Sequence, residues 1–335
     1  MMKKQLPPEW APQQLVQLTW PHEQTDWVDM LDEVNQCFAD IARNIVQHEK
    51  LLVVCKDSKQ IKTLLKGTDF SKITFVELPT NDTWARDHGG ITVLEDGKKA
   101  IYDFAFNGWG KKFEAKLDNQ ITKALHEKQV FGRDVIYRNC LDFVLEGGSI
   151  ESDGEGTLLT TSTCLLSDNR NDLSKEVIET RLKNYFGLHR VLWLNHGYLA
   201  GDDTDSHIDT LARFCDVSTI AYVKCEDETD EHYIELKKME EELMQFRTVS
   251  GNFYRLIPLP MADTVYDDEI RLPATYANFL IINDAVLVPT YQSPKDEIAL
   301  KQLGQAFPDR KTIGINCLPL IKQHGSLHCV TMQYI

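Results

Sequence analysis

The sequence lacks the features that mark membrane and secreted proteins. It has no run approaching about 18 uninterrupted apolar residues, the length that a membrane-spanning helix requires. Its first residues, MMKKQLPPEW, contain two lysines but no apolar segment behind them, so they do not form a secretory signal. We therefore expect a soluble, cytoplasmic protein that makes no contact with membranes.

Basic charge is scarce compared with acidic charge. The 335 residues include 36 Lys and Arg against 51 Asp and Glu, which gives a net charge of −15. Nucleic-acid phosphates require a basic protein face, so the composition excludes a nucleic-acid partner. An acidic chain suits a cationic small-molecule substrate, although a need for solubility explains the same composition equally well.

Cysteine is not scarce, but its spacing excludes the usual cysteine frameworks. The eight cysteines include no CxxC pair and no close Cys/His cluster with zinc-ligand spacing. A chain of this length without an export signal does not need disulfides to form a core. We expect most of these thiols, such as that of Cys55 in LLVVC, to be small buried hydrophobic groups, and we expect no metal or organic cofactor.

Nucleotide-binding loops are also missing, and an internal repeat is present in their place. No G-x-G-x-x-G follows a predicted strand, and no Walker loop occurs. Five times, an amphipathic helical pattern precedes a short apolar run. The five predicted helix–strand pairs are 27–47 with 51–55, 112–128 with 135–137, 174–186 with 191–194, 230–246 with 254–257, and 295–307 with 312–315.

This repeat predicts an α/β fold built from five modules of roughly sixty residues each. Modules of that size must stack on neighbours, and closing them into a ring gives a five-bladed pseudo-symmetric α/β propeller. An open doubly wound sheet is the alternative. We expect residues 1–335 to form a single catalytic domain, and a homo-oligomer remains possible.

One stretch in each module carries chemically capable residues. The stretches are TNDTWARDHGG (80–90), LEGGSI (145–150), GDDTDSHIDTLARF (201–214), ATYANF (274–279) and GSLHC (325–329). Because their spacing matches the period of the modules, a ring would bring their side chains to a common centre. The side chains expected there are Asp87, Glu146, His207, Asp209, Asn278 and Cys329.

Cys329 is the candidate nucleophile, because it follows a Gly-Ser turn, adjoins His328 and lies close to a predicted strand end. A buried structural thiol is the alternative, since free cysteine is among the most buried residue types. A thiol with a pKa of about 8.5 is mostly protonated at neutral pH, so its reaction requires an activating cation. A bound guanidinium group would itself be such a cation.

His207 and Asp209 are two residues apart and would share one face of a strand. A histidine there is suited to proton transfer near neutral pH. The preceding GDDTD also raises the possibility of a calcium loop, but it lacks the spaced ligands and distal Glu of an EF-hand.

The other candidates are carboxylates, an amide and two indoles. Asp87 can accept two parallel N–H bonds from a guanidinium, unless it simply pairs with neighbouring Arg86. Trp84 and Trp109 offer a wall for a cation, or are plain core. Glu146 precedes two glycines, and the alternative is that it is an ordinary turn residue. Asn278 lies in a predicted apolar strand, and the alternative is that it only ties loops together.

Together these segments resemble the agmatine deiminase family, a relative of bacterial peptidylarginine deiminases within the guanidine-modifying, pentein-type propeller superfamily. The resemblance rests on PPEWAPQQLVQLTWPH, NDTWARDHGG, DFAFNGWG, LEGGSIESDGEGT, GDDTDSHIDTLARF and GSLHCVTMQ, and covers nearly the whole chain.

The resemblance implies hydrolysis of agmatine through a covalent cysteine intermediate. It makes Cys329 the nucleophile and His207 the general acid and base, with Asp87 and Asp209 on the guanidinium nitrogens. The remaining implied positions are Glu146 beside the guanidinium, Asn278 lining the site, and Asp203 near the distal amine of the substrate.

The chain departs from the family pattern at three positions. It has His88 and Gly90 where many relatives read WxRDTGP, and Glu151 where His is frequent. These departures affect substrate preference more than the chemistry. The alternatives are therefore an arginine or peptidyl-arginine deiminase, a Cys-His-Asp amidase, and a guanidine-binding protein without catalysis.

Overall fold

The computed structural model describes residues 2–335. These residues form five sheets of three or four strands and one separate hairpin, with helices packed around them, so the fold is mixed α/β. The hairpin consists of β14 (Tyr266–Asp267) and β15 (Ile270–Arg271). Every helix among the described residues is too short or too polar to cross a membrane.

Four of the sheets share one strand order. In each, two strands adjacent in sequence pair antiparallel, and a third strand joins the second in parallel. The strands are β5 (Ile91–Glu95), β6 (Lys98–Ala105) and β7 (Ile136–Val144); β8 (Ile150–Ser152), β9 (Thr157–Thr161) and β10 (Arg190–Leu194); β11 (Ala212–Asp216), β12 (Thr219–Lys224) and β13 (Arg255–Pro260); and β16 (Leu280–Ile282), β17 (Ala285–Thr290) and β18 (Lys311–Asn316).

A helix leads into the parallel strand of each of these sheets, as a parallel connection requires. The four helices are α5 (Ile121–Glu127), α7 (Lys175–Phe186), α8 (Tyr233–Gln245) and α9 (Lys295–Ala306). The helix–strand pairs predicted from the repeat therefore correspond to real crossover units.

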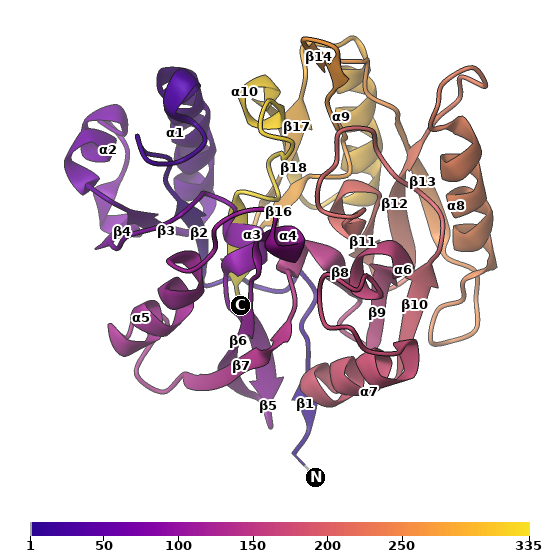
Figure 1. Cartoon of the computed structure of the whole chain (residues 1–335), viewed down its shortest axis with the longest axis horizontal. Helices are drawn as coiled ribbons and strands as arrows, with labels where there is room; N and C mark the ends of the chain where they lie inside the picture. Colours follow the sequence, from indigo (N-terminus) through magenta and orange to yellow (C-terminus); the bar gives the residue numbers. More distant parts are fainter. Residues whose placement is uncertain (1) are drawn as a thin grey trace.

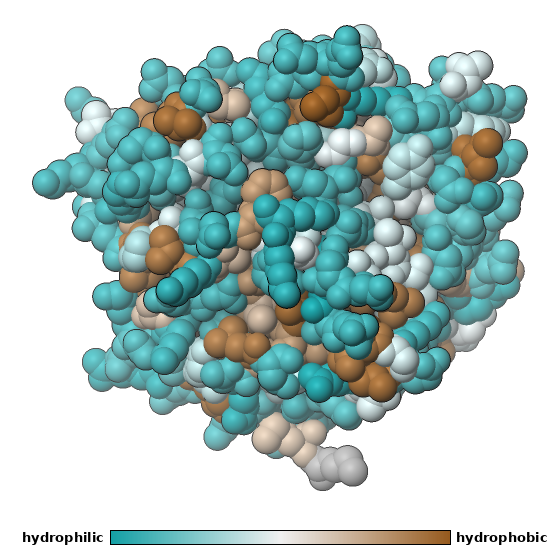
Figure 2. All heavy atoms as spheres, viewed as in Figure 1, coloured by the Kyte–Doolittle hydropathy of each residue, from teal (hydrophilic) through white to brown (hydrophobic). Residues whose placement is uncertain are grey.

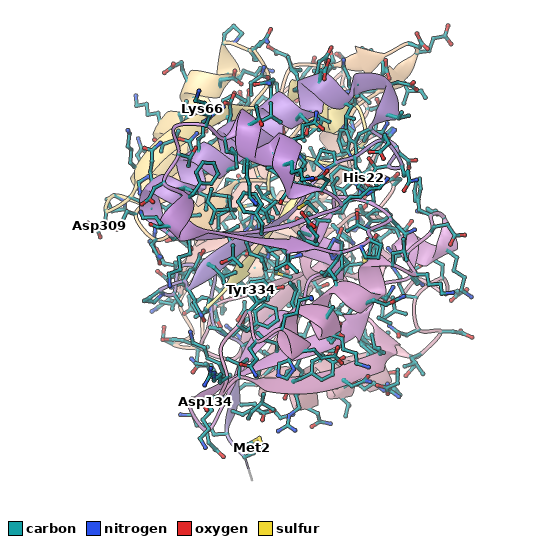
Figure 3. All side chains as sticks on the ribbon, turned by 90° about the vertical axis from the view of Figure 1, so that its left-hand side faces the viewer. Met2, His22, Lys66, Asp134, Asp309 and Tyr334 are labelled. Atoms are coloured by element: carbon teal, nitrogen blue, oxygen red, sulfur yellow. The ribbon has the colours of Figure 1, made fainter. Side chains whose placement is uncertain are left out.

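The remaining sheet brings the two ends of the chain together. Its order is β19 (Thr331–Tyr334), β2 (Leu15–Thr19), β3 (Lys50–Cys55) and β4 (Ile73–Glu77), with β19 antiparallel to β2. Helices α1 (Leu31–His48) and α2 (Ser58–Leu64) connect β2 to β3 and β3 to β4, and β1 (Lys4–Gln5) extends the sheet of β5. Tyr334 is only 2% exposed, and Figure 3 shows it away from the outer edge on which Met2 and Asp134 lie.

Strand β3 shows why the chain needs continuous apolar runs. Its side chains alternate between the two faces of the sheet. Leu51 and Val53 pack into one hydrophobic core, whereas Leu52 and Val54 pack into the other. A strand buried on both faces has no polar side, so its sequence is a run rather than an alternation.

Short helical turns connect the longer elements. They are α3 (Ala85–His88), α4 (Gly108–Lys111), α6 (Ser162–Leu165), α10 (Leu318–Ile321), η1 (Val28–Met30), η2 (Phe70–Lys72), η3 (Asp118–Gln120), η4 (Gly147–Ser149) and η5 (Ile208–Thr210). Figure 1 shows α3 and α4 near the middle of the molecule, while α1, α2, α5, α7 and α8 lie toward its rim. The face in Figure 2 is largely hydrophilic with scattered hydrophobic residues, as the acidic composition predicts.

The predicted helix 112–128 is wrong in its first half. Helix α5 begins only at Ile121, after the η3 turn. Residues 112–117 instead form turns and irregular backbone, which lead into η3 and then α5. The unit formed by α2 and β4 was not predicted, because its helix is only seven residues long.

Candidate active site

A pocket is lined by five of the nine residues singled out from the sequence. These are Trp84, Asp87, Trp109, Asp203 and Cys329. The other four are almost completely buried around it: Glu146, His207, Asp209 and Asn278. Side chains from six separate chain segments therefore meet at one place.

Cys329 lies in the turn just before β19 and is 6% exposed. Its Sγ is 3.4 Å from Oδ1 of Asn278 and 3.9 Å from Oδ2 of Asp209. Burial raises the pKa of the Cys329 thiol well above its usual range, and the charges of Asp209 and Asp87 raise it further. The free thiol is therefore protonated at neutral pH.

Asn278 was predicted within a strand, but it lies in the loop before β16. Outside the sheet ladder, its amide is free to bridge two segments. Its Oδ1 accepts bonds from the backbone N–H groups of His328 (2.8 Å) and Cys329 (3.3 Å), and its Nδ2 donates to the carbonyl of Asp209 (3.3 Å). Asn278 thus fixes the position of the thiol relative to Asp209.

Asp87 is held in helix α3 with both carboxylate oxygens occupied. Oδ1 accepts from the backbone N–H of Gly148 and Oδ2 from Nε1 of Trp109, each at 3.0 Å. Burial raises the pKa of Asp87 well above its usual range, and the neighbouring carboxylates Asp209 and Glu146 add to the rise. Arg86 bonds to Glu9, so the simple pairing of Arg86 with Asp87 is not what forms.

The two tryptophans belong to one aromatic cluster beside the pocket. The rings of Trp84 and Trp109 meet edge to face, with centroids 6.3 Å apart. Trp84 also packs on Trp27. Both indoles are therefore core residues that present one edge to the pocket, and Trp109 is in addition a hydrogen-bond donor to Asp87.

His207 and Asp209 do not lie on a strand as predicted. His207 is the residue before the turn η5, and Asp209 lies within that turn. They still reach one site: Nδ1 of His207 is 3.6 Å from Oδ1 of Asp87, and Oδ2 of Asp209 faces Cys329. Burial lowers the pKa of His207 to about 4, so its ring is neutral at pH 7.

Gly148 explains the two glycines that follow Glu146. A Cβ at Gly148 would lie 2.7 Å from Nδ1 of His207 and 2.8 Å from Oδ1 of Asp87. The backbone must pass this close to donate its N–H to Asp87, so no side chain fits. The site is therefore closed on this side by backbone.

Arg170 was not identified from the sequence. Its Nε donates to Oε1 of Glu146 (2.8 Å), and its Nη1 donates to Oδ2 of Asp205 (2.6 Å). Burial raises the pKa of Glu146 despite this partner. The only signal was an arginine in the loop before α7, which sequence reasoning cannot distinguish from a surface residue.

Three buried polar atoms at this site have no hydrogen-bond partner within residues 2–335. They are Oε2 of Glu146, Nε2 of His207 and Oδ1 of Asp209. We call Asp87, Glu146, His207, Asp209 and Cys329 the substrate cluster. Unsatisfied buried polar atoms are costly, so they point to a ligand that supplies the missing bonds.

A second group of charges lies directly behind the substrate cluster and was also missed. Its members are Glu9, Arg86, Glu151, Arg213 and His328, which we call the ion-pair cluster.

Within the ion-pair cluster every carboxylate oxygen has a partner. Glu9 bonds to Arg86 (3.1 Å) and Arg213 (2.6 Å), and Glu151 bonds to Arg213 and to the backbone N–H of Phe214. Burial raises the pKa of Glu9, but the charges of His328 and the two arginines outweigh it and hold the pKa well below its usual range.

His328 joins the two clusters. Its Nδ1 donates to Oδ2 of Asp209 at 2.7 Å, while its Nε2 lies 2.8 Å from Oε1 of Glu9 and 3.0 Å from Nη2 of Arg213. Burial raises the pKa of Asp209, but the bond from His328 outweighs it, so the net pKa of Asp209 is lowered. Asp209 therefore stays ionised.

The three departures from the family pattern do not line the pocket of Cys329. His88 is buried against Phe106, and a Cβ at Gly90 would clash with Ile101 and Thr122. Glu151 belongs to the ion-pair cluster. Their effect on substrate preference would therefore have to be indirect.

The acidic loop GDDTD is built around its own backbone rather than around a calcium ion. Asp202 accepts bonds from the backbone N–H groups of Thr204 (3.2 Å) and Ser206 (2.7 Å). Asp205 pairs with Arg170 and with Lys112. Asp203 alone of the three lines the pocket, and burial raises its pKa.

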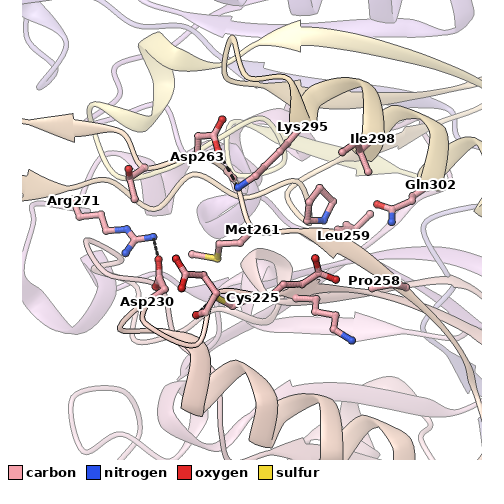
Figure 4. A pocket seen from close by; sticks show the side chains of 16 residues that line it. Cys225, Asp230, Pro258, Leu259, Met261, Asp263, Arg271, Lys295, Ile298 and Gln302 are labelled. Atoms are coloured by element: carbon pink, nitrogen blue, oxygen red, sulfur yellow. Dashed lines mark hydrogen bonds and ion pairs between the residues drawn. The ribbon is translucent and has the colours of Figure 1, made fainter.

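A larger cavity of about 500 Å³ lies elsewhere, beside β13 and α9. Figure 4 shows that its charged side chains face one another. Lys295 pairs with Asp263 (2.9 Å), and Arg271 pairs with Asp230 (2.8 Å). These two cations are already paired, and none of the nine residues singled out from the sequence lines this cavity.

Comparison with known proteins identifies the family. Residues 5–334 match the family described as Porphyromonas-type peptidyl-arginine deiminase. The chain belongs to this family. An agmatine deiminase from Pseudomonas aeruginosa (strain LESB58) is 31% identical, over 98% of this chain and 94% of that protein.

Solved structures agree with the family assignment. A Porphyromonas gingivalis protein, named provisionally as an arginine deiminase, is 60% identical with a TM-score of 0.96, over 99% of this chain and 98% of the other. A C. jejuni agmatine deiminase, with a cysteine replaced by serine and substrate bound, is 41% identical with a TM-score of 0.93, over 99% and 96%. Dimethylarginine dimethylaminohydrolase, at 12% identity and a TM-score of 0.52, shares the fold alone.

Proposed function

We propose that this deiminase-family chain is an agmatine deiminase, which hydrolyses agmatine to N-carbamoylputrescine and ammonia. One observation carries the proposal: the Cys329 thiol shares its site with buried acids and a histidine whose free atoms lack partners. The agmatine deiminases among its relatives support the substrate.

The charge of the substrate cluster favours a cationic ligand. Asp87, Glu146 and Asp209 are buried close together, and burial and then their mutual repulsion raise the pKa of Asp87. A guanidinium is planar and donates parallel N–H bonds, which suits carboxylates on either side of it. Binding it would relieve the repulsion between the acids and supply the bonds that Asp209 and Glu146 lack.

The same cation activates the nucleophile. A bound guanidinium offsets the negative charges that keep Cys329 protonated, so the thiol loses its proton, which His207 takes up. The thiolate then forms an S–C bond to the guanidinium carbon. His207 returns the proton to one amino group, the C–N bond breaks, and ammonia leaves a thiouronium cation bound to Sγ.

In the second half of the reaction, water takes the place of the thiolate as the nucleophile. Neutral His207 takes a proton from water as the oxygen attacks the thiouronium carbon. The C–S bond then breaks, its electrons return to sulfur, and His207 reprotonates the thiolate. The released urea is N-carbamoylputrescine, and the remaining proton leaves with ammonia. Asp87, Glu146 and Asp209 stabilise the positive charge throughout.

The acids of the pocket are suited to an amine rather than a carboxylate. Asp26, Asp82 and Asp203 line it. These acids would attract the distal ammonium of agmatine and repel the carboxylate of free arginine. A peptidyl-arginine substrate is the second candidate, because the family description names it.

For the architecture, we propose that the five sheets are the blades of a pseudo-symmetric α/β propeller and that residues 1–335 act as one catalytic unit. The repeated antiparallel-then-parallel strand order supports this arrangement. A homo-oligomer is compatible with it and would be tested by light scattering of the purified protein.

The decisive experiment incubates the purified protein with agmatine, arginine and an arginyl peptide and identifies each product by mass. We expect N-carbamoylputrescine from agmatine and little citrulline from the others. Cys329→Ala should abolish ammonia release while leaving the fold intact. Faster turnover of the peptide would replace agmatine by peptidyl-arginine, and activity in Cys329→Ala would remove the nucleophile assignment.

A further inference from the structure

Two groups of three potential metal ligands occur among the described residues. One consists of Glu146, Cys164 and His207, and the other of Glu9, Glu151 and His328. Within each group, one ligand atom from each residue lies within 4.8 Å of the others. The two groups differ in whether those atoms are free.

The group of Glu9, Glu151 and His328 is already occupied by protein cations. Arg213 bonds to all three residues, and Arg86 bonds to Glu9 as well. A dication would have to displace a buried guanidinium and then face its charge. This group is therefore not a metal site.

In the group that contains Cys164, two potential ligand atoms have no hydrogen-bond partner among the described residues, whereas the other group is bonded to arginines. Arg170 binds only Oε1 of Glu146, so Oε2 has no hydrogen-bond partner within residues 2–335, and Nε2 of His207 has none either. Both residues are at most 1% exposed.

Cys164 adds the third donor, and substrate chemistry does not require it. It lies in α6, directly after β9, where the Oγ1 of Thr161 accepts its backbone N–H at 3.3 Å. Its side chain is completely buried. A cysteine fixed beside an acid and a histidine gives a sulfur, an oxygen and a nitrogen donor, each of a type that binds zinc.

We propose that Glu146, Cys164 and His207 form an inhibitory site for a Zn²⁺-like transition-metal dication. Zinc–ligand bonds of about 2.0–2.3 Å in a tetrahedron separate the ligand atoms by about 3.5 Å, so these atoms need to close in by about 1 Å. Cys164 loses its proton on binding, as a metal-bound thiol does. The fourth position is left to water.

Metal binding would stop the reaction without touching Cys329. Glu146 and His207 cannot serve substrate while they hold a metal, so the metal and agmatine compete for the same two side chains. Arg170 does not prevent binding, because its charge is balanced by Asp205 at 2.6 Å. The site would thus make the enzyme sensitive to free transition-metal ions.

The first test measures agmatine turnover against Zn²⁺ concentration. We expect inhibition that a chelator reverses and that agmatine relieves. Cys164→Ala should keep its metal-free turnover and require at least about tenfold more Zn²⁺ for half-inhibition. Cys140→Ala removes another buried cysteine, in β7, and should match the wild type. Equal inhibition of Cys164→Ala and wild type would overturn the site.

The second test does not depend on the proposed reaction, whereas the activity readout above does. Co²⁺ replaces Zn²⁺, and a thiolate–cobalt absorption band reports sulfur ligation. Cys329→Ala should retain the band and one bound Co²⁺, whereas Cys164→Ala should lose the band. A band that disappears with Cys329→Ala would place the metal on Cys329 and refute the proposal. Cobalt ligation in a chain that does not turn over agmatine would refute only the proposed function.

Discussion

The substrate cluster and the ion-pair cluster are both buried groups of charge, and they differ in how completely their atoms are paired. Each carboxylate oxygen of Glu9 and Glu151 has a partner. In contrast, Glu146, His207 and Asp209 each leave one polar atom free. Burial alone therefore does not distinguish the two clusters; the difference lies in the acids, whose oxygens are all paired in the ion-pair cluster and are left partly unpaired in the substrate cluster.

The largest expected effect is a loss of activity without a loss of stability when Glu146 of the substrate cluster is replaced. Glu146→Gln keeps the shape of the side chain and one acceptor for Arg170, but removes the negative charge. We expect kcat to fall roughly 10²- to 10³-fold, because an electrostatic contact to the reacting group is lost.

The free energy of unfolding of Glu146→Gln should stay within about 1 kcal/mol of the wild type, since a repelling buried charge is removed. Steady-state kinetics and urea denaturation measure the two quantities. A large loss of stability with unchanged kcat would reverse the distinction between the clusters.

The opposite pattern is expected in the ion-pair cluster. Arg213→Met leaves Glu9 and Glu151 buried without their shared partner, which should lower the free energy of unfolding by about 3–5 kcal/mol. Urea denaturation measures this. Arg181→Met is the matched control, because Arg181 pairs with exposed Asp142 at 3.4 Å and should cost under about 1 kcal/mol.

A pH dependence follows from His207. Burial lowers its folded-state pKa to about 4, while its unfolded-state pKa is about 6.5. The unfolded chain therefore binds the proton first, and the wild type loses stability as the pH falls from about 6.5 to about 4.

His207→Asn removes this contribution. Relative to the wild type, the variant should gain about 2 kcal/mol of stability between pH 7.5 and pH 5. Urea denaturation at both pH values gives the difference. If the difference between variant and wild type does not change with pH, the ring of His207 is not held neutral by burial.

The smallest effect concerns the link between the clusters. His328→Asn keeps a donor near the position of Nδ1, which faces Asp209, whereas His328→Gln keeps one near Nε2, which faces Glu9. If His328 positions Asp209, the Gln variant should lower kcat about tenfold more than the Asn variant. The Gln variant loses the hydrogen bond to Asp209, and one hydrogen bond to a charged group is worth about 1.5 kcal/mol.

Comparable losses in the two His328 variants would make its role purely structural. The profile of kcat against pH should distinguish the variants further, since only the Gln variant frees Asp209 to bind a proton.

The family and its motifs could be predicted from the sequence, and the family match confirms them. Four of the five predicted helices match observed ones, at 27–47, 174–186, 230–246 and 295–307, the first of them beginning as the turn η1. Their amphipathic patterns were long enough to be clear. The helix predicted over 112–128 was wrong in its first half, where turns and η3 precede α5.

The ion-pair cluster could not be predicted, because its contacts span the chain. Glu9 meets Arg213 and His328, which are 204 and 319 residues away. No local periodicity records such a pairing. A weak signal did exist in Arg213, a charge inside the apolar segment LARFCDV, since a buried charge requires a partner.

The sequence by itself determined which groups are available: a thiol, a histidine, several acids and five α/β units that need neighbours to bury their apolar faces. Only the tertiary structure decided which charges are paired and which atoms are left free, because that depends on close approach between segments far apart in the chain. His207 and Asp209 illustrate this, since both reach the site from a turn, whereas the spacing alone indicated a strand.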